Sequence, residues 1–140
     1  MTRPALRTLF LGDRRIAWRV MMHLTSAPLS EAFDIRGLVT GEAMEHALRQ
    51  RGVSLPETVL RNDARHSDAL RQLIERERID MILSIQHNWI LPDDILSSVD
   101  GRAYNLHNAK LPDYKGYNSV SHAILNGDET YVSTVHRMVA

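Results

Sequence analysis

Short apolar runs alternate with amphipathic segments of helical length along most of the chain. Residues 8–12 form an apolar run that ends at a glycine, as expected for a strand buried in a sheet. Residues 81–85, with the sequence MILSI, give the clearest strand pattern. On the same reasoning we predict five strands, at 8–12, 33–40, 81–85, 103–107 and 131–139.

Between these strands, apolar residues recur at the three- and four-residue intervals of a helix. Ile16, Val20 and Leu24 mark one such face, so residues 14–25 are predicted to be helical. Ser67 is a typical helix N-cap and predicts a helix after it. Further helices are predicted at 42–51, 92–99 and 117–125, and residues 53–65 are predicted to form a loop.

Strands that alternate with helices predict βαβ units, and therefore an α/β fold. We expect a mostly parallel open sheet with helices on both faces, in one domain over residues 1–140. Right-handed crossovers place the loops that follow the strands along one edge, where ligands bind in such sheets. Residues 12–14, 86–91 and 107–118 are expected at that edge.

The composition excludes several classes of protein. With 44% hydrophobic and 24% charged residues, the chain of 140 residues is neither disordered nor fibrous and is long enough for one core. The formal net charge is zero, so no overall field attracts nucleic acid or an anionic membrane, although a local patch stays open. Without cysteine there is no disulfide framework and no thiolate metal site.

The sequence gives no sign of a membrane or secretory protein. No apolar run reaches membrane-spanning length, and the first residues lack the apolar core of a secretory signal. We therefore expect a cytoplasmic protein with no membrane partner.

The strongest candidates for chemistry are Asn105 and His107, at the end of the fourth predicted strand. Two residues apart on a strand, they project to the same face. A carboxamide and an imidazole side by side suit a reaction in which a carbonyl oxygen gains negative charge, because the amide donates to the oxyanion and the histidine donates or shuttles a proton. Taken alone, this pair more often describes a histidine that is satisfied within the core.

Two other kinds of site find less support. The seven histidines include no pair at the spacing of a His-Glu-x-x-His zinc motif, and His87, His107 and His136 converge only if their strands are neighbours. The turn after the first strand lacks the three glycines of a dinucleotide-binding fingerprint. We therefore expect neither a metal nor a classical dinucleotide cofactor.

The segment IQHNWILPDD, residues 85–94, places large apolar side chains in a predicted loop. They either plug the core or wall a pocket for a flat ring. The two lysines of the chain, Lys110 and Lys115, lie in the other long loop, whereas the sequence has 15 arginines. Either arginine-rich codon usage or a need for a compact ammonium group explains that placement.

Together, the two segments resemble the 10-formyltetrahydrofolate-dependent formyltransferase family, which includes glycinamide ribonucleotide, methionyl-tRNA and sugar N-formyltransferases. The resemblance covers about the last 60 residues, from DMILSIQHNWILPDDIL to TVHRMV. The family signature is an Asn-x-His at a strand end, then Leu-Pro, a basic residue and a glycine, then Ala-Ile and Gly-Asp. It is matched in order by Asn105, His107, Leu111, Pro112, Lys115, Gly116, Ala123, Ile124, Gly127 and Asp128.

The resemblance implies a Rossmann-like formyltransferase fold with 10-formyltetrahydrofolate as formyl donor. It implies that an acceptor amine attacks the formyl carbon directly, that Asn105 holds the formyl oxygen, and that His107 stabilises the oxyanion and assists proton transfer. The residues implied to cradle the pterin are His87, Asn88, Trp89, Ile90, Leu91 and Pro92. Those implied to face the acceptor are Lys110, Lys115, Tyr117 and Asn118.

The sequence departs from the family pattern in two places. Many members have His-Pro-Ser-Leu-Leu-Pro, whereas this chain reads HNAKLP from His107. The resemblance implies that this changed segment lies beside the acceptor pocket. The family's third catalytic group is an aspartate in an Asp-x-Gly after the strand equivalent to TVHRMV, and the sequence reaches Ala140 before it. We therefore expect a catalytic domain truncated before that aspartate, lacking the C-terminal part of the fold and inactive alone.

The acceptor follows less directly from the resemblance. The segment HNAKLPDYKGYN is closest to the methionyl-tRNA and sugar N-formyltransferase branch, and we expect a small-molecule amine, a nucleotide-linked amino sugar. The alternatives are methionyl-tRNA, for which the neutral charge gives no support, water, as in a formyltetrahydrofolate hydrolase, and an inactive fragment with a binding role only. The oligomeric state is left open.

Overall fold

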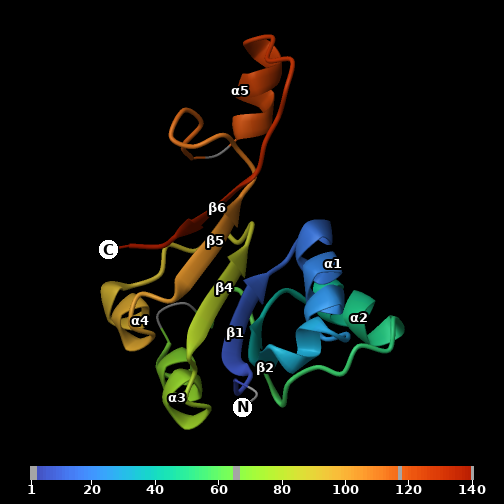
Figure 1. Cartoon of the computed structure of the whole chain (residues 1–140), viewed down its shortest axis with the longest axis vertical. Helices are drawn as coiled ribbons and strands as arrows, with labels where there is room; N and C mark the ends of the chain where they lie inside the picture. Colours follow the sequence, from blue (N-terminus) through green and yellow to red (C-terminus); the bar gives the residue numbers. More distant parts are fainter. Residues whose placement is uncertain (1–2, 65–66, 117, 140) are drawn as a thin grey trace.

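A six-stranded sheet runs through the computed structural model of the chain, which describes residues 3–64, 67–116 and 118–139 (Figure 1). The spatial order of its strands is β3-β2-β1-β4-β5-β6. The strands are β1 (Leu6–Gly12), β2 (Phe33–Val39), β3 (Thr58–Leu60), β4 (Met81–Ile85), β5 (Ala103–His107) and β6 (Thr134–Arg137).

The first five strands are parallel, and β6 is antiparallel to β5. The chain builds outward from β1 to β2 and β3 and then returns to the other side of β1 with β4. This reversal separates the loops that follow β1 and β4, and such a switch point is where open α/β sheets bind ligands. The predicted sheet, mostly parallel and open, is confirmed.

Helices cover both faces of the sheet, as predicted. In Figure 1, α1 (Arg15–Leu24) and α2 (Glu42–Gln50) lie on one side, and α3 (Asp68–Arg76) and α4 (Asp93–Ser98) lie on the other. A short 3-10 helix, η1 (Leu29–Glu31), follows α1. Ser67 is the N-cap of α3, because its Oγ accepts the backbone N–H of Leu70 at 3.3 Å. No helix within the described ranges has the length and apolarity needed to cross a membrane.

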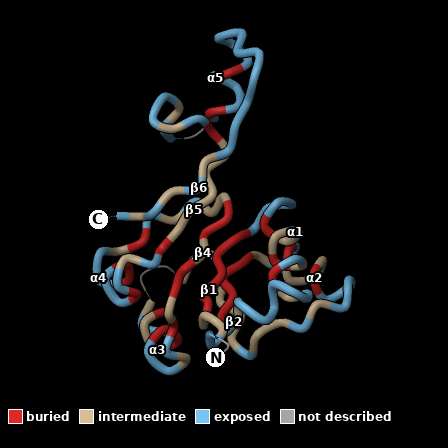
Figure 2. Tube along the Cα trace, in the orientation of Figure 1, coloured by how far each residue is buried: buried red, intermediate tan, exposed pale blue. Residues whose placement is uncertain are grey.

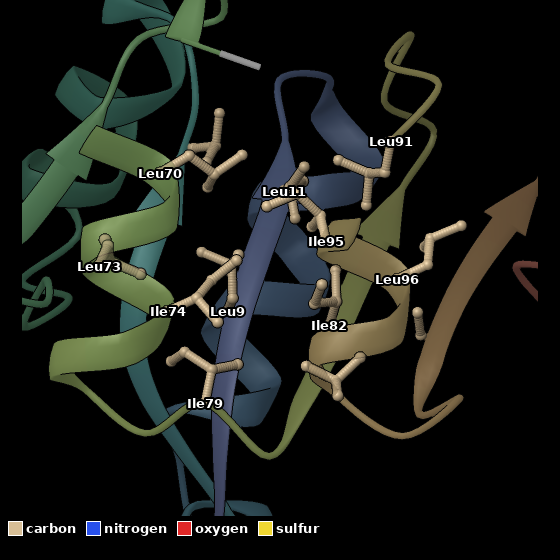
Figure 3. Close-up of a cluster of buried hydrophobic side chains, with 13 residues drawn as sticks. Leu9, Leu11, Leu70, Leu73, Ile74, Ile79, Ile82, Leu91, Ile95 and Leu96 are labelled. Carbon is tan, nitrogen blue, oxygen red and sulfur yellow. The ribbon is translucent and has the colours of Figure 1, made fainter. Parts of the chain in front are cut away.

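Each face of the sheet has its own buried cluster. Figure 3 shows the cluster under α3 and α4, where Leu9 and Leu11 of β1 meet Leu73 of α3 and Ile95 of α4. On the opposite face, Phe10 packs with residues of α1 and α2. Figure 2 shows that the buried residues, in red, run along β1 and β4. Since burying one such side chain stabilises by about 1.5–3 kcal/mol, the central strands are rigidly held.

Two strands differ from their predicted limits. Residues 53–65 were predicted to be a loop, but β3 forms inside this segment and pairs with β2 over Gly37 to Val39. Three half-buried residues at a sheet edge leave too short a pattern to recognise. The strand predicted at 131–139 is shorter, because regular pairing with β5 covers only Thr134–Arg137. Apolar content alone does not show where a ladder ends.

The segment that carries α5 (Ser119–Leu125) extends away from the rest of the fold (Figure 1). Figure 2 shows it as mostly exposed. The buried residues of α5 are Ser119 and Ala123. Ile124 is 72% exposed and Leu125 is 82% exposed. The helix thus lies beside the sheet's C-terminal edge and not over the core.

Candidate active site

Asn105 and His107 lie at the C-terminal end of β5, with their side chains on the face covered by α3 and α4. Across the antiparallel pair with β6, Asn105 is opposite His136. The amide Nδ2 of Asn105 is 3.4 Å from Nε2 of His136, and Nδ1 of His136 is 3.1 Å from the backbone oxygen of Arg137. Since a carbonyl oxygen only accepts, Nδ1 of neutral His136 carries the proton and Nε2 accepts from Asn105.

This contact fixes the orientation of the Asn105 amide. One of its two N–H groups points to His136, and the second is left for another acceptor. The Oδ1 atom of Asn105 is buried and has no hydrogen-bond partner among the described residues. A buried polar atom left unpaired costs about 1–3 kcal/mol, so the amide is held in place at some expense to stability. Such expense is typical of functional sites.

His107 anchors the loop that follows β5. Its Nε2 donates to the backbone oxygen of Tyr114 at 3.1 Å, which leaves Nδ1 as the acceptor of a neutral ring. Tyr114 is itself held, because its hydroxyl donates to Asp128 Oδ2 at 2.5 Å. That hydrogen bond to the Asp128 carboxylate raises the pKa of Tyr114. The loop therefore folds back onto the strand end that bears the two candidate residues.

A cleft of about 490 Å³ opens at this edge and takes in both Asn105 and His107. Its walls come from the loop after β4, the loop after β5 and the start of α5. The predicted site residues that line it are Asn105, His107, His87, Asn88, Trp89, Ile90 and Asn118. The structure thus brings most of the predicted residues together around one cavity.

Other predicted residues lie elsewhere. Leu91 is buried in the core at 5% exposure, and Pro92 is the N-cap of α4. Lys110 is exposed and its Nζ is 3.4 Å from Asp113 Oδ2, while Lys115 is also exposed. Tyr117 lies outside the described residues.

Several lining residues were not found by sequence reasoning. Arg14 enters from the turn after β1, and Ser119 and Ser121 enter from α5. The remaining ones are Gln86, Asn108, Gly116 and Val120. Asn108 directly follows His107, and its backbone oxygen accepts the hydroxyls of Ser119 and Tyr131. Arg14, Gln86, Asn108 and Gly116 fall in the segments expected at the ligand-binding edge, whereas the lining residues of α5 carry no such signal in the sequence.

A chain of hydrogen bonds joins the loops behind the cleft. Asp13 accepts the Gly41 N–H at Oδ1 and the Asn62 Nδ2–H at Oδ2, both at 2.9 Å. The Oδ1 atom of Asn62 is 3.0 Å from His87 Nε2, and its backbone oxygen accepts the Trp89 indole N–H at 2.6 Å. The His87 and Trp89 rings meet edge to face at 4.8 Å between centroids. A second cavity of about 430 Å³ lies against these residues.

The partly buried ring of His87 has a consequence for stability. Burial lowers its pKa from 6.5 to about 4, so the folded ring stays neutral where an unfolded histidine takes up a proton. The stability that depends on neutral His87 is complete above pH 6.5 and is lost as the pH falls toward 4. After allowance for partial exposure of the ring, we expect a loss of about 1–2 kcal/mol between pH 7 and pH 5 from this group.

Urea unfolding of the chain and of His87→Gln at both pH values measures this loss. The difference in unfolding free energy between the two proteins is expected to shrink by that amount at pH 5. His46→Gln, an exposed histidine of α2, is the matched control and should keep the pH dependence of the unsubstituted chain. An equal pH dependence in His87→Gln and the unsubstituted chain would contradict the expectation.

The described residues contain no group of three or more histidine, aspartate or glutamate side chains placed to hold a metal ion. His107 and His136 lie on neighbouring strands, but each has another partner, the Tyr114 backbone oxygen for one and the Asn105 amide for the other. The cleft offers an oriented amide donor, Asn105, and an imidazole, His107, and Trp89 also lines it. An amide donor and an imidazole suit stabilisation of an oxygen that gains charge.

Comparison with known proteins identifies the family and the fold. The sequence model described as formyl transferase matches residues 30–139. The bifunctional polymyxin resistance protein ArnA of Wigglesworthia glossinidia brevipalpis is 37% identical over 59 residues, which is 42% of this chain and 9% of that protein.

Among solved structures, phosphoribosylglycinamide formyltransferase from Anaplasma phagocytophilum superposes with a TM-score of 0.75 at 18% identity, over 95% of this chain and 64% of that one. A formyltetrahydrofolate deformylase from Pseudomonas syringae pv. tomato superposes with a TM-score of 0.78 at 15% identity. This superposition covers 99% of this chain and 47% of that one. The chain thus spans less than two thirds of the length of these relatives. At such identities the superpositions show a shared fold, whereas the sequence match covers most of the chain. The chain belongs to the formyl transferase family.

Proposed function

We propose that the protein transfers a formyl group from 10-formyltetrahydrofolate to the amine of a small acceptor, a nucleotide-linked amino sugar. The observation that carries this proposal is the placement of Asn105 and His107 on the same face of β5, in a cleft that Trp89 also lines. A neutral amide and an imidazole supply what direct transfer needs, which is position and stabilisation of the oxyanion.

In the proposed reaction, the acceptor amine forms a C–N bond to the formyl carbon and the formyl oxygen gains negative charge. The second N–H of the Asn105 amide, not used by His136, donates to this oxygen. His107, whose Nε2–H is held by the Tyr114 backbone oxygen, takes a proton from the attacking amine at Nδ1. The charged ring then stabilises the oxyanion and passes that proton to the leaving nitrogen of the donor. When the oxygen regains its double bond, the bond to the donor nitrogen breaks.

The donor side is assigned to the loop after β4. Trp89 is held at its indole nitrogen by Asn62, so the ring presents a fixed apolar surface. Ile90 is 85% exposed beside it, and an apolar side chain so exposed in a cleft is suited to cover a flat ring. His87 and Asn88 complete this wall. Leu91 and Pro92 act behind it, through the core and the start of α4.

The acceptor side is assigned to the loop after β5. Asn118 lines the cleft, and Lys110 and Lys115 lie exposed along the same loop. Two ammonium groups on a loop that contributes to the cleft favour an acceptor that carries phosphate, and a nucleotide-linked sugar does so. Tyr117 belongs to this proposed side by its place in the sequence.

We also propose that the complete catalytic domain extends past Ala140, to the aspartate expected in an Asp-x-Gly, and that this chain alone is inactive. The proposal is supported by the shorter span of the chain, which covers 64% and 47% of two superposed structures. An aspartate there would orient His107 and accept the proton of the amine.

Radiolabelled formyl transfer tests the function. Full-length protein is given labelled 10-formyltetrahydrofolate with a nucleotide-linked amino sugar, with methionyl-tRNA, or with neither. Label in the sugar supports the proposal, and no label from residues 1–140 alone supports the truncation. Label in the tRNA, or labelled formate released equally fast without an acceptor, would assign the site to another acceptor or to water.

A further inference from the structure

Four loops at the C-terminal edge of the sheet are tied together by the side chains of Asp13 and Asn62. Asp13 follows β1 and bonds to the Gly41 amide after β2. Asn62 follows β3 and bonds to His87 and Trp89 after β4. At Gly41 the approach is so close that a Cβ atom would lie 2.5 Å from Asp13 Oδ1, so any larger residue there would displace the Asp13 side chain. The contacts link residues as far as 49 positions apart in sequence.

The chemistry of these groups orders the hydrogen bonds in one direction. A carboxylate only accepts, so Asn62 must turn its Nδ2 toward Asp13 and its Oδ1 toward His87. An amide oxygen also only accepts, so Nε2 of His87 must carry the proton. The neutral ring then has no proton on Nδ1, and this atom is buried without a partner among the described residues.

We propose that Asp13 and Asn62 are positioning residues that fix the tautomer of His87, so that its Nδ1 is the acceptor for an N–H group of the heterocycle bound in the cleft. His87 lines both the main cleft and the adjoining cavity. The ligand hydrogen bond removes the cost of leaving this buried atom unpaired. Burial, which lowers the pKa of His87, keeps the ring neutral near pH 7 and preserves the acceptor.

This inference rests on the proposed function only for the identity of the ligand, the formyl donor. The tautomer itself is a property of the free chain. A test of the tautomer therefore succeeds or fails whether or not formyl transfer is observed.

Asp13→Asn reverses the direction of the hydrogen bonds with almost no change in shape. If Oδ1 of the new side chain still accepts the Gly41 N–H, its Nδ2 faces Asn62 and donates. Asn62 must then present its Oδ1 to residue 13 and its Nδ2 to His87, which requires an unprotonated Nε2. The proton of the His87 ring is expected to move to Nδ1.

Nitrogen-15 NMR of the histidine rings in the chain distinguishes the two tautomers, with the His87 signals assigned from His87→Gln. We expect Nε2–H in the unsubstituted chain and Nδ1–H in Asp13→Asn. Asp63→Asn is the matched control, an exposed aspartate next to Asn62, and should keep Nε2–H. Asn62→Ala removes the connection between Asp13 and His87 and should give a mixture of the two His87 tautomers. This variant replaces Asp13→Asn in the test if Asp13→Asn does not fold. Nδ1–H in the unsubstituted chain, or Nε2–H retained in both variants, would overturn the tautomer assignment.

Kinetics of the full-length protein test the ligand contact. Loss of the acceptor is expected to raise KM for the formyl donor about tenfold in Asp13→Asn, with kcat changed much less, because the contact is made in the ground state and the transition state alike. A shifted tautomer with an unchanged donor KM would overturn the ligand contact while leaving the tautomer assignment in place.

Discussion

Replacement of Asn105 by alanine in the full-length protein is expected to lower kcat for formyl transfer about 10²- to 10³-fold, the usual effect of losing one donor to an oxyanion. The structure gives the reason. The amide bonds to His136 through one N–H and keeps the other for the oxygen that gains charge. Because this contact strengthens in the transition state, the loss should appear mainly in kcat. Single-turnover rates at saturating donor and acceptor measure it.

Asn105→Asp separates the donor from the shape of the side chain. A carboxylate fills the same space but gives no N–H, so the loss should be at least as large as in Asn105→Ala. Gln72→Ala removes an exposed amide of α3 and should leave the rate unchanged. If Asn105→Asp kept the unsubstituted rate, the proposed role of the amide would be wrong.

His107→Ala is expected to lower kcat by about 10²- to 10⁴-fold, the range for a group that transfers protons. The ring also holds the Tyr114 backbone oxygen at 3.1 Å, so the alanine variant loosens the loop after β5 as well. Added imidazole distinguishes these two effects. A small base that enters the space left by the ring should restore part of the rate if proton transfer was lost, and it does not re-form the tether to the loop.

The control is His122→Ala, an exposed histidine on α5 whose loss should not affect the rate. Loss of acceptor affinity in His107→Ala, with kcat unchanged, would show that the histidine only positions the loop. The two variants at 105 and 107 are expected to be non-additive, because both act on the same oxygen.

The fold could be predicted where local pattern and tertiary structure agree. Buried parallel strands are apolar throughout, so residues 81–85 stand out in the sequence, and they form β4 as expected. The same-face placement of Asn105 and His107 follows from the period of a strand. The resemblance to the formyltransferase family rests on residues in a fixed order along the chain, and such an order can be read directly from the sequence.

The parts that escaped prediction depend on contacts between distant loops. Asn62 lies in a segment with no periodicity, and its importance comes from Asp13, 49 positions earlier, and His87, 25 positions later. For Leu91 the sequence pattern was visible, but the direction of the side chain was not. It continues the apolar run of Trp89 and Ile90, yet the chain turns so that Leu91 enters the core while Ile90 stays exposed. A loop has no fixed period from which such directions follow.

The extended segment that carries α5 gives the two walls of the cleft different local stabilities. One wall continues from β4, which is held by buried side chains on both faces of the sheet. The other includes Asn118 and α5, most of whose side chains are exposed, so opening it breaks few buried contacts. Under the proposed function, the acceptor wall can be reshaped by substitution at little cost to the core, so related chains could change their acceptor while keeping the same donor and the same chemistry.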